Sequence, residues 1–221
     1  MNEKAISYLK AKDKRLAKVI ESVGEIEIYQ HTDSFYFLVR EIVGQMVSAA
    51  VKKVIFNRLI AICNNDICPE MLLKLQVQEL RAIGLSNAKS QFILSLAEMV
   101  ANGEINFGSF EMMSDNEVLH QLTSIKGIGN WTAKMYLLFF IQREDILPYE
   151  DGAFLQAYRW LYNTRKCDQK SIEKRCKKWK PYTSIAARYL YRALDTGLTK
   201  QPIKDFLAEE TSDKENNRDM G

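Results

Sequence analysis

The sequence predicts an all-α protein, and three observations support that prediction. The 221 residues include only four prolines and ten glycines, and the abundant Leu, Ala, Lys and Glu residues favour helices. No alternating apolar pattern of useful strand length is present, and the brief alternation at residues 23–29 indicates a short extended link. From Phe35 to Met46, apolar residues recur at the spacing of a helix that buries one side. The length suffices for one large domain or two small lobes.

The composition is that of an ordinary soluble globular protein, with 47% hydrophobic and 27% charged residues. We expect no signal peptide and no membrane span, because no apolar run approaches the length needed. The net charge of +3 is uneven: residues 165–192 carry ten Lys and Arg against two acidic residues, and residues 205–221 carry a net −4, which leaves +7 elsewhere. A basic body suits a nucleic-acid partner, although a solvated helix face would have the same composition.

The four cysteines do not predict a metal site. Cys63, Cys68, Cys167 and Cys176 have the spacing of neither a zinc site nor an iron–sulfur site. We therefore expect reduced thiols of the kind that the cytosol maintains.

The N-terminal part is expected to form short helices. Residues 1–22 have the apolar spacing of one amphipathic helix, unless the lysine-rich stretch at 10–16 interrupts it as a turn. Asp33 or Ser34 would cap the next helix. The stretch from Gln45 to Ser48 breaks the apolar pattern and would separate that helix from the one that follows.

The middle helices are predicted from their ends. Pro69 starts a helix that would run to about Leu80. Gly84 is expected to end a helix, and Ser86 to cap the next one. Ser114 would cap the helix that leads to residue 123.

The C-terminal part is predicted in the same way. Residues 154–162 form an amphipathic helix, and Ser171 would cap a basic helix that ends near Lys178. Pro181 lies near the first turn of the last helix, where its missing N–H is not needed. The tail at 209–221 is acidic and lacks large apolar residues, so we expect it to be disordered.

A glycine-rich turn at residues 125–129 is the most informative stretch. Gly127 and Gly129 have no Cβ, so the turn can adopt positive φ and admit another backbone closely. The helix that opens at about Asn130 presents unpaired N–H groups and a positive dipole end, which suit a phosphate beside Thr132 and Lys134. The plainer alternative is a corner in which the glycines only let two helices pack.

The motif LTSIKGIGNWTAKM resembles the helix-hairpin-helix signature of the base-excision DNA glycosylases (the HhH-GPD superfamily). The following Pro148–Asp151 is similar to that superfamily's Gly/Pro-rich segment, which carries a catalytic Asp. The resemblance extends over about residues 35–190 and is closest to the monofunctional DNA-3-methyladenine glycosylases II. It implies a two-lobed helical fold with the active-site cleft between the lobes. The glycosylase domain would span 1–208, with one lobe of 36–145 that holds the hairpin at 123–133, and a second lobe of 1–35 plus 146–208.

The resemblance also implies which residues carry the chemistry. Asp151 would be the catalytic carboxylate; its neighbour Glu150 is a rival, and an N-cap role for Asp151 is compatible with catalysis. Superfamily members that also cut the strand carry a Lys nucleophile where this chain has Trp131. We therefore expect a monofunctional enzyme whose base pocket is lined by Trp131, Met135 and Tyr182, although each could instead be core.

The DNA contacts follow from the same resemblance. The hairpin, with Gly127, Gly129, Thr132 and Lys134, would grip the phosphate backbone. The segment from Ile42 to Ser48 is similar to the family's wedge segment, which would make Met46 the plug in the duplex and Gln45 its neighbour in the groove. The family's hairpin often holds a monovalent cation (Na⁺ or K⁺), and the matching backbone carbonyls here belong to Thr123, Ile125 and Gly127. No iron–sulfur cluster is expected.

The predicted function is hydrolysis of the N-glycosidic bond of a damaged, alkylated base that has been flipped out of duplex DNA. Two alternatives remain: a glycosylase for another lesion, such as 8-oxoguanine or a deaminated purine, and a catalytically silent protein that only binds DNA. We expect a monomer with damaged duplex DNA as its partner. It would work in the bacterial cytoplasm beside the nucleoid, or in the nucleus of a eukaryote.

Overall fold

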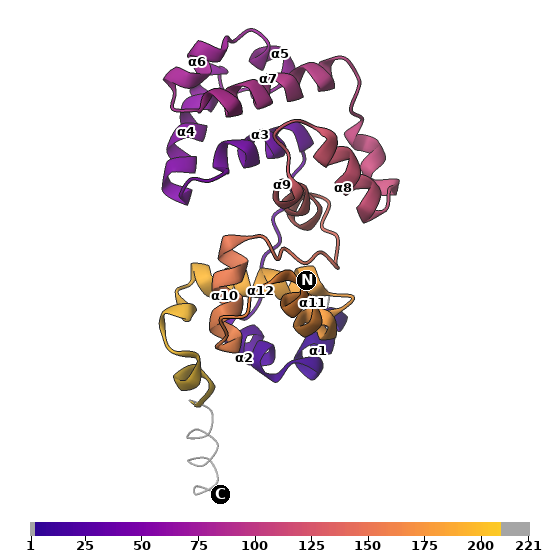
Figure 1. The fold of residues 1–221 in the computed structure, drawn as a ribbon, viewed down its shortest axis with the longest axis vertical. Coiled ribbons are helices and arrows are strands. Elements are labelled where there is room, and N and C mark those ends of the chain that lie inside the picture. Colours follow the sequence, from indigo (N-terminus) through magenta and orange to yellow (C-terminus); the bar gives the residue numbers. More distant parts are fainter. Residues whose placement is uncertain (1–2, 209–221) are drawn as a thin grey trace, which may run out of the picture. The chain divides into compact units, whose positions relative to one another are not determined.

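The computed structural model describes residues 3–208, and every regular element in that range is helical (Figure 1). The predicted all-α class is confirmed. The labelled α-helices are α1 (Glu3–Lys12), α2 (Lys14–Val23), α3 (Ser34–Gly44), α4 (Ala49–Ile62), α5 (Pro69–Leu72), α6 (Val77–Ala82), α7 (Asn87–Ala101), α8 (Asp115–Ser124), α9 (Asn130–Met135), α10 (Gly152–Tyr162), α11 (Gln169–Cys176) and α12 (Thr183–Asp195). The remaining turns are the 3-10 helices η1 (Phe107–Met112), η3 (Lys177–Trp179) and η4 (Leu198–Lys200) and the π-helix η2 (Tyr136–Phe140).

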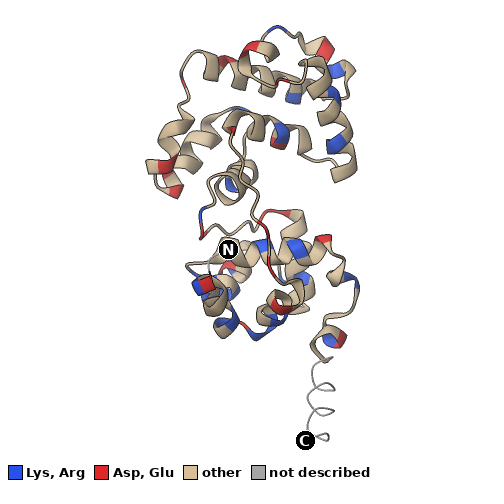
Figure 2. Ribbon diagram, turned by 180° about the vertical axis from the view of Figure 1, so that it is seen from behind, with Lys and Arg blue, Asp and Glu red and all other residues tan. Residues whose placement is uncertain are grey.

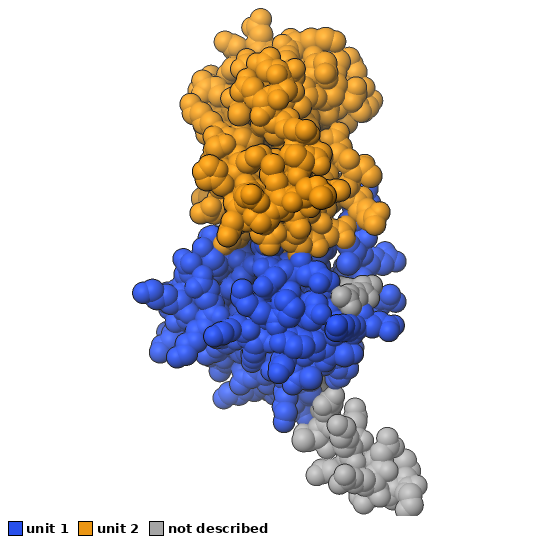
Figure 3. Space-filling view, turned by 90° about the vertical axis from the view of Figure 1, so that its right-hand side faces the viewer, with its two compact units in different colours: residues 1–29, 144–221 blue, residues 30–143 orange. Residues whose placement is uncertain are grey.

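The chain divides into two compact units, coloured separately in Figure 3. Unit 1 combines residues 1–29 with 144–221, and unit 2 holds residues 30–143. Unit 1 therefore joins α1 and α2 to the helices from α10 onward, and unit 2 holds α3 to η2. Within the described range, no helix is long and apolar enough to cross a membrane. The tail predicted to be disordered lies outside the described residues.

Local capping sets most of the helix starts. Asp33, Ser86 and Ser114 are the N-caps of α3, α7 and α8, as predicted. The N-terminal stretch forms two helices rather than one, because the Asp13 carboxylate accepts hydrogen bonds from the amides of Arg15 and Leu16 and so starts α2. The turn inside the basic stretch at 10–16 was the alternative that the sequence left open.

Two predicted boundaries are wrong. The helix from Pro69 ends at Leu72, and α6 begins anew after Gln76, whose amide donates to the Glu79 carboxylate at 2.8 Å in a capping box. The basic helix α11 is capped by Asp168, not Ser171: the amide of Ser171 donates to the Asp168 carboxylate at 3.0 Å. Asp is as good an N-cap as Ser, and it comes first in the chain.

An aromatic cluster forms part of the core of unit 2. The Tyr136 ring stacks on Phe140 at 4.7 Å and meets Phe37 and Phe110 edge-on at 5.9 and 6.0 Å. Its hydroxyl lies 2.8 Å from the Ser34 hydroxyl, and burial raises the pKa of Tyr136 to about 12. This cluster packs α3 against the helix that follows the hairpin.

A buried carboxylate organises unit 1. Asp13 is 3% exposed and accepts hydrogen bonds from Trp179 Nε1 at 3.0 Å and from the Tyr162 hydroxyl, and it pairs with Lys178 Nζ at 2.8 Å. Burial by itself would raise the pKa of Asp13, but the hydrogen bonds from Lys178, Tyr162 and Trp179 outweigh it and keep that pKa below its ordinary value. One side chain thus ties the α1–α2 corner to α10 and to the turn before α12.

Candidate active site

The glycine-rich turn joins α8 to α9, and its two glycines differ in what the fold requires. Gly127 has φ +91°, and a Cβ there would lie 2.2 Å from the Phe92 ring. Gly129, the N-cap of α9, has φ −93°, and a Cβ there would meet nothing within 4 Å. Packing therefore explains Gly127, whereas the space beside Gly129 is open to a close backbone approach from outside the chain.

The side chain of Gln45 fastens the turn to the end of α3. Its amide nitrogen donates to the Gly127 carbonyl at 2.9 Å and to the Thr132 hydroxyl at 3.1 Å. The Lys89 ammonium donates to the carbonyls of Val43 at 2.9 Å and Gln45 at 2.5 Å, and burial lowers the pKa of Lys89. The α3–α4 junction and the hairpin are thus held together as one assembly.

This assembly corrects part of the predicted phosphate contact. Thr132 is 1% exposed, and its hydroxyl faces Gln45 rather than solvent. Lys134 is 9% exposed, so its side chain does not extend from the hairpin surface. Both side chains were expected to lie beside the phosphate, but the Thr132 hydroxyl bonds to Gln45 and the Lys134 side chain is largely buried. The amide of Gln45 is likewise engaged with the hairpin.

Met46 projects fully from the α3–α4 junction. Its side chain has 102% relative exposure, and its backbone has φ +56°, which is uncommon for a residue with a Cβ. Ser48 then caps α4 by accepting a hydrogen bond from the Val51 amide at 3.3 Å. An exposed apolar side chain held on a tightly turned backbone is the geometry that a wedge requires.

The predicted pocket residues of unit 2 lie on one helix. Trp131 stands in the first turn of α9 and is half-buried, and Met135, one turn later, is 4% exposed. The residue spacing places both side chains on the same face of the helix. Trp131 thus retains accessible surface, while Met135 belongs to the packed interior beneath it.

Asp151 is a buried carboxylate with a fixed orientation. It is 8% exposed and caps α10, accepting a hydrogen bond from the Phe154 amide at 2.7 Å. Glu150 is exposed, so the two neighbouring carboxylates face different environments. The N-cap role of Asp151 is real, and it fixes the side chain at the positive end of a helix of eleven residues.

Tyr191 is a neighbour of Asp151 that the sequence did not reveal. It lies on α12, its hydroxyl oxygen is buried, and its pKa is raised well above the ordinary value, first by burial and then by the charge and hydrogen bonding of the Asp151 carboxylate. The phenol therefore stays protonated and supports the carboxylate. Only tertiary packing brings residues forty positions apart together, so no sequence signal could have identified this pair.

Tyr182 immediately precedes α12 and is half-buried. Its ring meets the Tyr8 ring edge-on, with centroids 5.5 Å apart and planes at 72°. Tyr8, on α1, was not singled out from the sequence. Unit 1 thus offers an aromatic pair as well as the Asp151 carboxylate.

The carbonyls predicted for a monovalent cation are partly engaged. The Ile125 carbonyl accepts a hydrogen bond from the Ile128 amide at 3.0 Å, and the Gly127 carbonyl accepts one from Gln45. A carbonyl oxygen has two lone pairs, so each retains capacity for a cation. A monovalent cation site on these two carbonyls and that of Thr123 stays a prediction.

Comparison with known proteins gives this geometry a context. Residues 39–181 match the HhH-GPD superfamily of base excision DNA repair proteins. That range contains the α3–α4 junction, the hairpin and Asp151, and it covers more than half of the chain.

Several named relatives match over most of their length. DNA-3-methyladenine glycosylase 1 of Schizosaccharomyces pombe is 29% identical over 195 residues, which are 86% of each chain. The solved structure of the Bacillus halodurans DNA-3-methyladenine glycosidase is 30% identical, with a TM-score of 0.78, and the match covers 92% of this chain and 95% of that one. The S. pombe 3-methyladenine DNA glycosylase Mag1 in complex with abasic DNA has a TM-score of 0.79 at 29% identity, covering 86% and 96%.

Proposed function

This chain belongs to the HhH-GPD superfamily of base excision DNA repair proteins, and from that membership we propose that it is a monofunctional DNA glycosylase for alkylated bases. The observation that carries the proposal is the buried, oriented carboxylate of Asp151 in a chain of this family. A protein that only bound DNA would gain nothing from a carboxylate facing phosphates. Relatives named 3-methyladenine glycosylases support an alkylated base as the substrate.

The reaction breaks the bond between C1′ of deoxyribose and the base nitrogen. Positive charge accumulates on the sugar as the bond lengthens, because the transition state resembles an oxocarbenium ion. The Asp151 carboxylate stabilises that charge and orients the attacking water. The hydrogen bond that it accepts from the Phe154 amide keeps it in place before the substrate arrives. The products are the free base and an abasic site.

Trp131 supports the monofunctional mechanism. Strand cleavage by this superfamily needs a Lys nucleophile at that position, and an indole cannot form a Schiff base. Lys126 is exposed on the turn and Lys134 is buried behind it, so neither substitutes for the missing amine at position 131. Water is therefore the nucleophile.

The aromatic side chains supply affinity for the damaged base. An alkylated purine such as 3-methyladenine carries positive charge, and the electron-rich faces of Trp131 and Tyr182 attract a cation. The same charge makes the base a good leaving group, so no acid is needed to protonate it. Met135 is buried one helical turn after Trp131, where it provides apolar support for the indole.

Unit 2 binds the DNA through its hairpin and through Met46. The hairpin binds a phosphate through backbone N–H groups at Gly127 and Gly129, with the positive end of α9 behind them. A monovalent cation on the carbonyls of Thr123, Ile125 and Gly127 would add positive charge there. Met46 fills the gap in the stack that the flipped nucleotide leaves.

The direct test is base release from duplex DNA treated with a methylating agent. Chromatography should show 3-methyladenine, and a denaturing gel should show the strand intact until hot alkali cuts it at the abasic site. Cleavage of the strand by the enzyme alone would reject the monofunctional mechanism. Absence of any released alkylated base would reject the substrate class, and duplexes with 8-oxoguanine, hypoxanthine or uracil would then be screened.

A further inference from the structure

The positive charge of the described chain is concentrated in unit 1 (Figure 2). Its described residues, 3–29 and 144–208, carry nineteen Lys and Arg against thirteen Asp and Glu, whereas residues 30–143 carry ten of each. The unit that holds the hairpin is thus neutral overall. A duplex is a polyanion whose backbone provides most of the electrostatic attraction, so the net positive charge of unit 1 adds to whatever the hairpin contributes locally.

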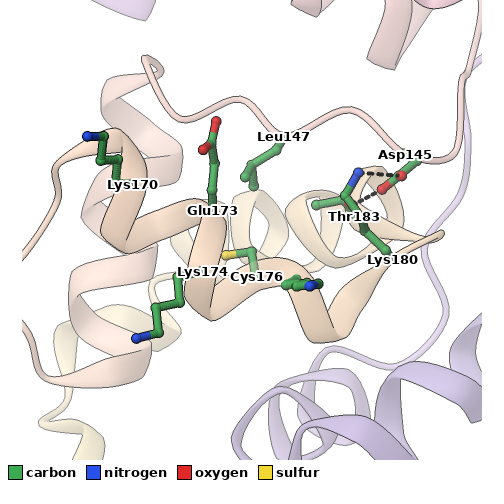
Figure 4. A pocket seen from close by; sticks show the side chains of 9 residues that line it. Asp145, Leu147, Lys170, Glu173, Lys174, Cys176, Lys180 and Thr183 are labelled. Atoms are coloured by element: carbon green, nitrogen blue, oxygen red, sulfur yellow. Dashed lines mark hydrogen bonds and ion pairs between the residues drawn. The ribbon is translucent and has the colours of Figure 1, made fainter.

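Unit 1 contains a basic concavity of about 740 Å³. Figure 4 shows its lining side chains, which come from the segment before α10, from α11 with η3, and from the start of α12. We call it the lysine pocket, and its lining residues are Asp145, Leu147, Lys170, Glu173, Lys174, Cys176, Lys177, Lys180 and Thr183.

The wall of the lysine pocket is fixed by several contacts. The Asp145 carboxylate accepts a hydrogen bond from the Thr183 hydroxyl and pairs with Lys180 Nζ at 3.3 Å. The Ser184 amide donates to the Glu144 carbonyl at 2.9 Å, and the Ile146 amide donates to the Ser184 hydroxyl at 2.8 Å. These bonds hold the segment before Asp151 against the start of α12.

Three of the pocket's four lysines form no salt bridge within residues 3–208, and the lining holds four lysines against the two carboxylates of Asp145 and Glu173. Lys180 is paired with Asp145, and Glu173 accepts a hydrogen bond from the Gln169 amide at 2.8 Å. Lys170, Lys174 and Lys177 are exposed, and none of them forms a salt bridge with any residue between 3 and 208. They are spaced four and three residues apart along α11 and η3, so they form one row about 10 Å long.

Such a row matches the backbone of a nucleic acid strand. Successive phosphates of one strand advance about 3.4 Å along the duplex axis, so a row of about 10 Å spans roughly three of them. Lysine ammonium groups act as flexible point charges and need no fixed approach direction, which suits contact with any base sequence. A small anion would need convergent, buried donors, and these three lysines are exposed instead.

The chain also places the pocket close to the carboxylate. Leu147, in the pocket wall, precedes Asp151 by four residues, which can span at most about 14 Å when fully extended. The turns at Leu147–Tyr149 and Pro148–Asp151, closed by hydrogen bonds of 3.0 Å each, shorten that distance further. A strand whose C1′ faces Asp151 therefore has its neighbouring phosphates within about four nucleotides of the pocket wall.

We propose that the lysine pocket is a second phosphate-binding surface, which holds the DNA strand beside the flipped nucleotide through Lys170, Lys174 and Lys177. The inference rests on the proposed function for the identity of the polyanion. The pocket supplies the charge that the neutral hairpin unit lacks, and the contact is independent of sequence and of damage.

The test is the salt dependence of binding to an undamaged duplex by the full chain. The triple variant Lys170→Gln/Lys174→Gln/Lys177→Gln removes three exposed charges, so the slope of log K against log salt should become shallower by roughly 2 to 3. The matched control is Lys166→Gln/Lys200→Gln/Lys204→Gln, which removes three exposed charges of the same unit outside the pocket. The control should change the slope by less than about 1.

A slope for the pocket variant equal to that of the control would overturn the inference, since net charge alone would then explain the effect. Calorimetry with inorganic phosphate is a second measurement. If the pocket variant keeps the wild-type salt slope on DNA but is the only variant that loses phosphate binding, the pocket is a small-anion site. That result would also overturn the inference. Because the probe is undamaged DNA, the result does not depend on base release. If the pocket variant has a shallower salt slope but wild type releases no base, only the proposed function is rejected. If wild type releases base but the pocket variant has an unchanged salt slope, only this inference is rejected.

Discussion

The side-chain nitrogen of Gln45 donates to the carbonyl of Gly127 at 2.9 Å, across 82 positions of the sequence. The residue before Met46, the proposed wedge, is thereby bonded to the turn that we propose binds a phosphate. Neither the projection of Met46 nor the conformation of the hairpin is set independently of the other. This bond joins the two elements of unit 2 that we propose bind DNA.

Gln45→Ala should lower both the stability of the fold and the affinity for duplex DNA. The Thr132 hydroxyl and the Gly127 carbonyl would lose a donor, and leaving buried groups unpaired costs about 1–3 kcal/mol. We expect a loss of that size in the free energy of unfolding measured with urea, and weaker duplex binding. Gln91→Ala, at an exposed position on α7, is the control and should leave both unchanged. Equal stability of the two variants would show that the bond contributes nothing.

Substitutions at the two glycines of the turn should have different effects, one on stability and the other on DNA binding. Gly127→Ala should cost more than about 2 kcal/mol of unfolding free energy, since its Cβ meets the Phe92 ring and its φ is +91°. Gly129→Val should cost about 1 kcal/mol or less, because the space is open, yet weaken duplex binding by about tenfold or more. Denaturation and binding assays separate the two effects. Wild-type affinity of Gly129→Val for any duplex would contradict the hairpin assignment.

Met46→Ala should affect catalysis and not stability. A fully exposed side chain contributes little to folding, so the unfolding free energy should change by less than about 0.5 kcal/mol. Without the wedge, the flipped state is less populated, and single-turnover base release should fall by about tenfold to a hundredfold. Met112, at 92% exposure, offers a matched Met112→Ala control that should behave as wild type. Identical excision rates for the two variants would remove Met46 from the mechanism.

Protonation of the Asp13 carboxylate should lower the stability of the protein in acid. Its pKa in the folded protein lies below the ordinary value of 3.8, so the folded state favours the charged form. Its contribution is therefore present above about pH 4 and is lost as the pH falls through the lowered pKa. Asp13→Asn should lose about 2–4 kcal/mol at pH 7 and show a smaller difference from wild type at pH 3, measured by urea unfolding. Exposed Asp195→Asn is the control; an equal loss for Asp13→Asn at both pH values would refute the linkage.

The sequence predicted the features that depend on neighbouring residues. The caps at Asp33, Ser86 and Ser114 were predictable because each bond spans only three positions. The break between α5 and α6 was missed because no Gly or Pro marks it. The π-helix η2 was also missed, since no Gly or Pro marks residues 136–140.

The motifs indicated candidate site residues, but they could not predict how those residues are arranged. The exposure of Met46 and the burial of Asp151 agree with the roles that the motifs implied. The inward orientation of Thr132 and the support of Asp151 by Tyr191 arise from contacts between distant segments. Periodicity and spacing carry no information about such contacts, because they describe one segment at a time.

The most direct test of the account is single-turnover base release from methylated duplex by wild type, Asp151→Asn and Glu150→Gln. Asn is as good an N-cap as Asp, so Asp151→Asn should retain the fold and bind duplex within about threefold of wild type. Its rate of base release should fall by about 10²–10⁴, whereas Glu150→Gln should release base as wild type does. Base release by Asp151→Asn at the wild-type rate would contradict the central claim that this carboxylate drives the reaction.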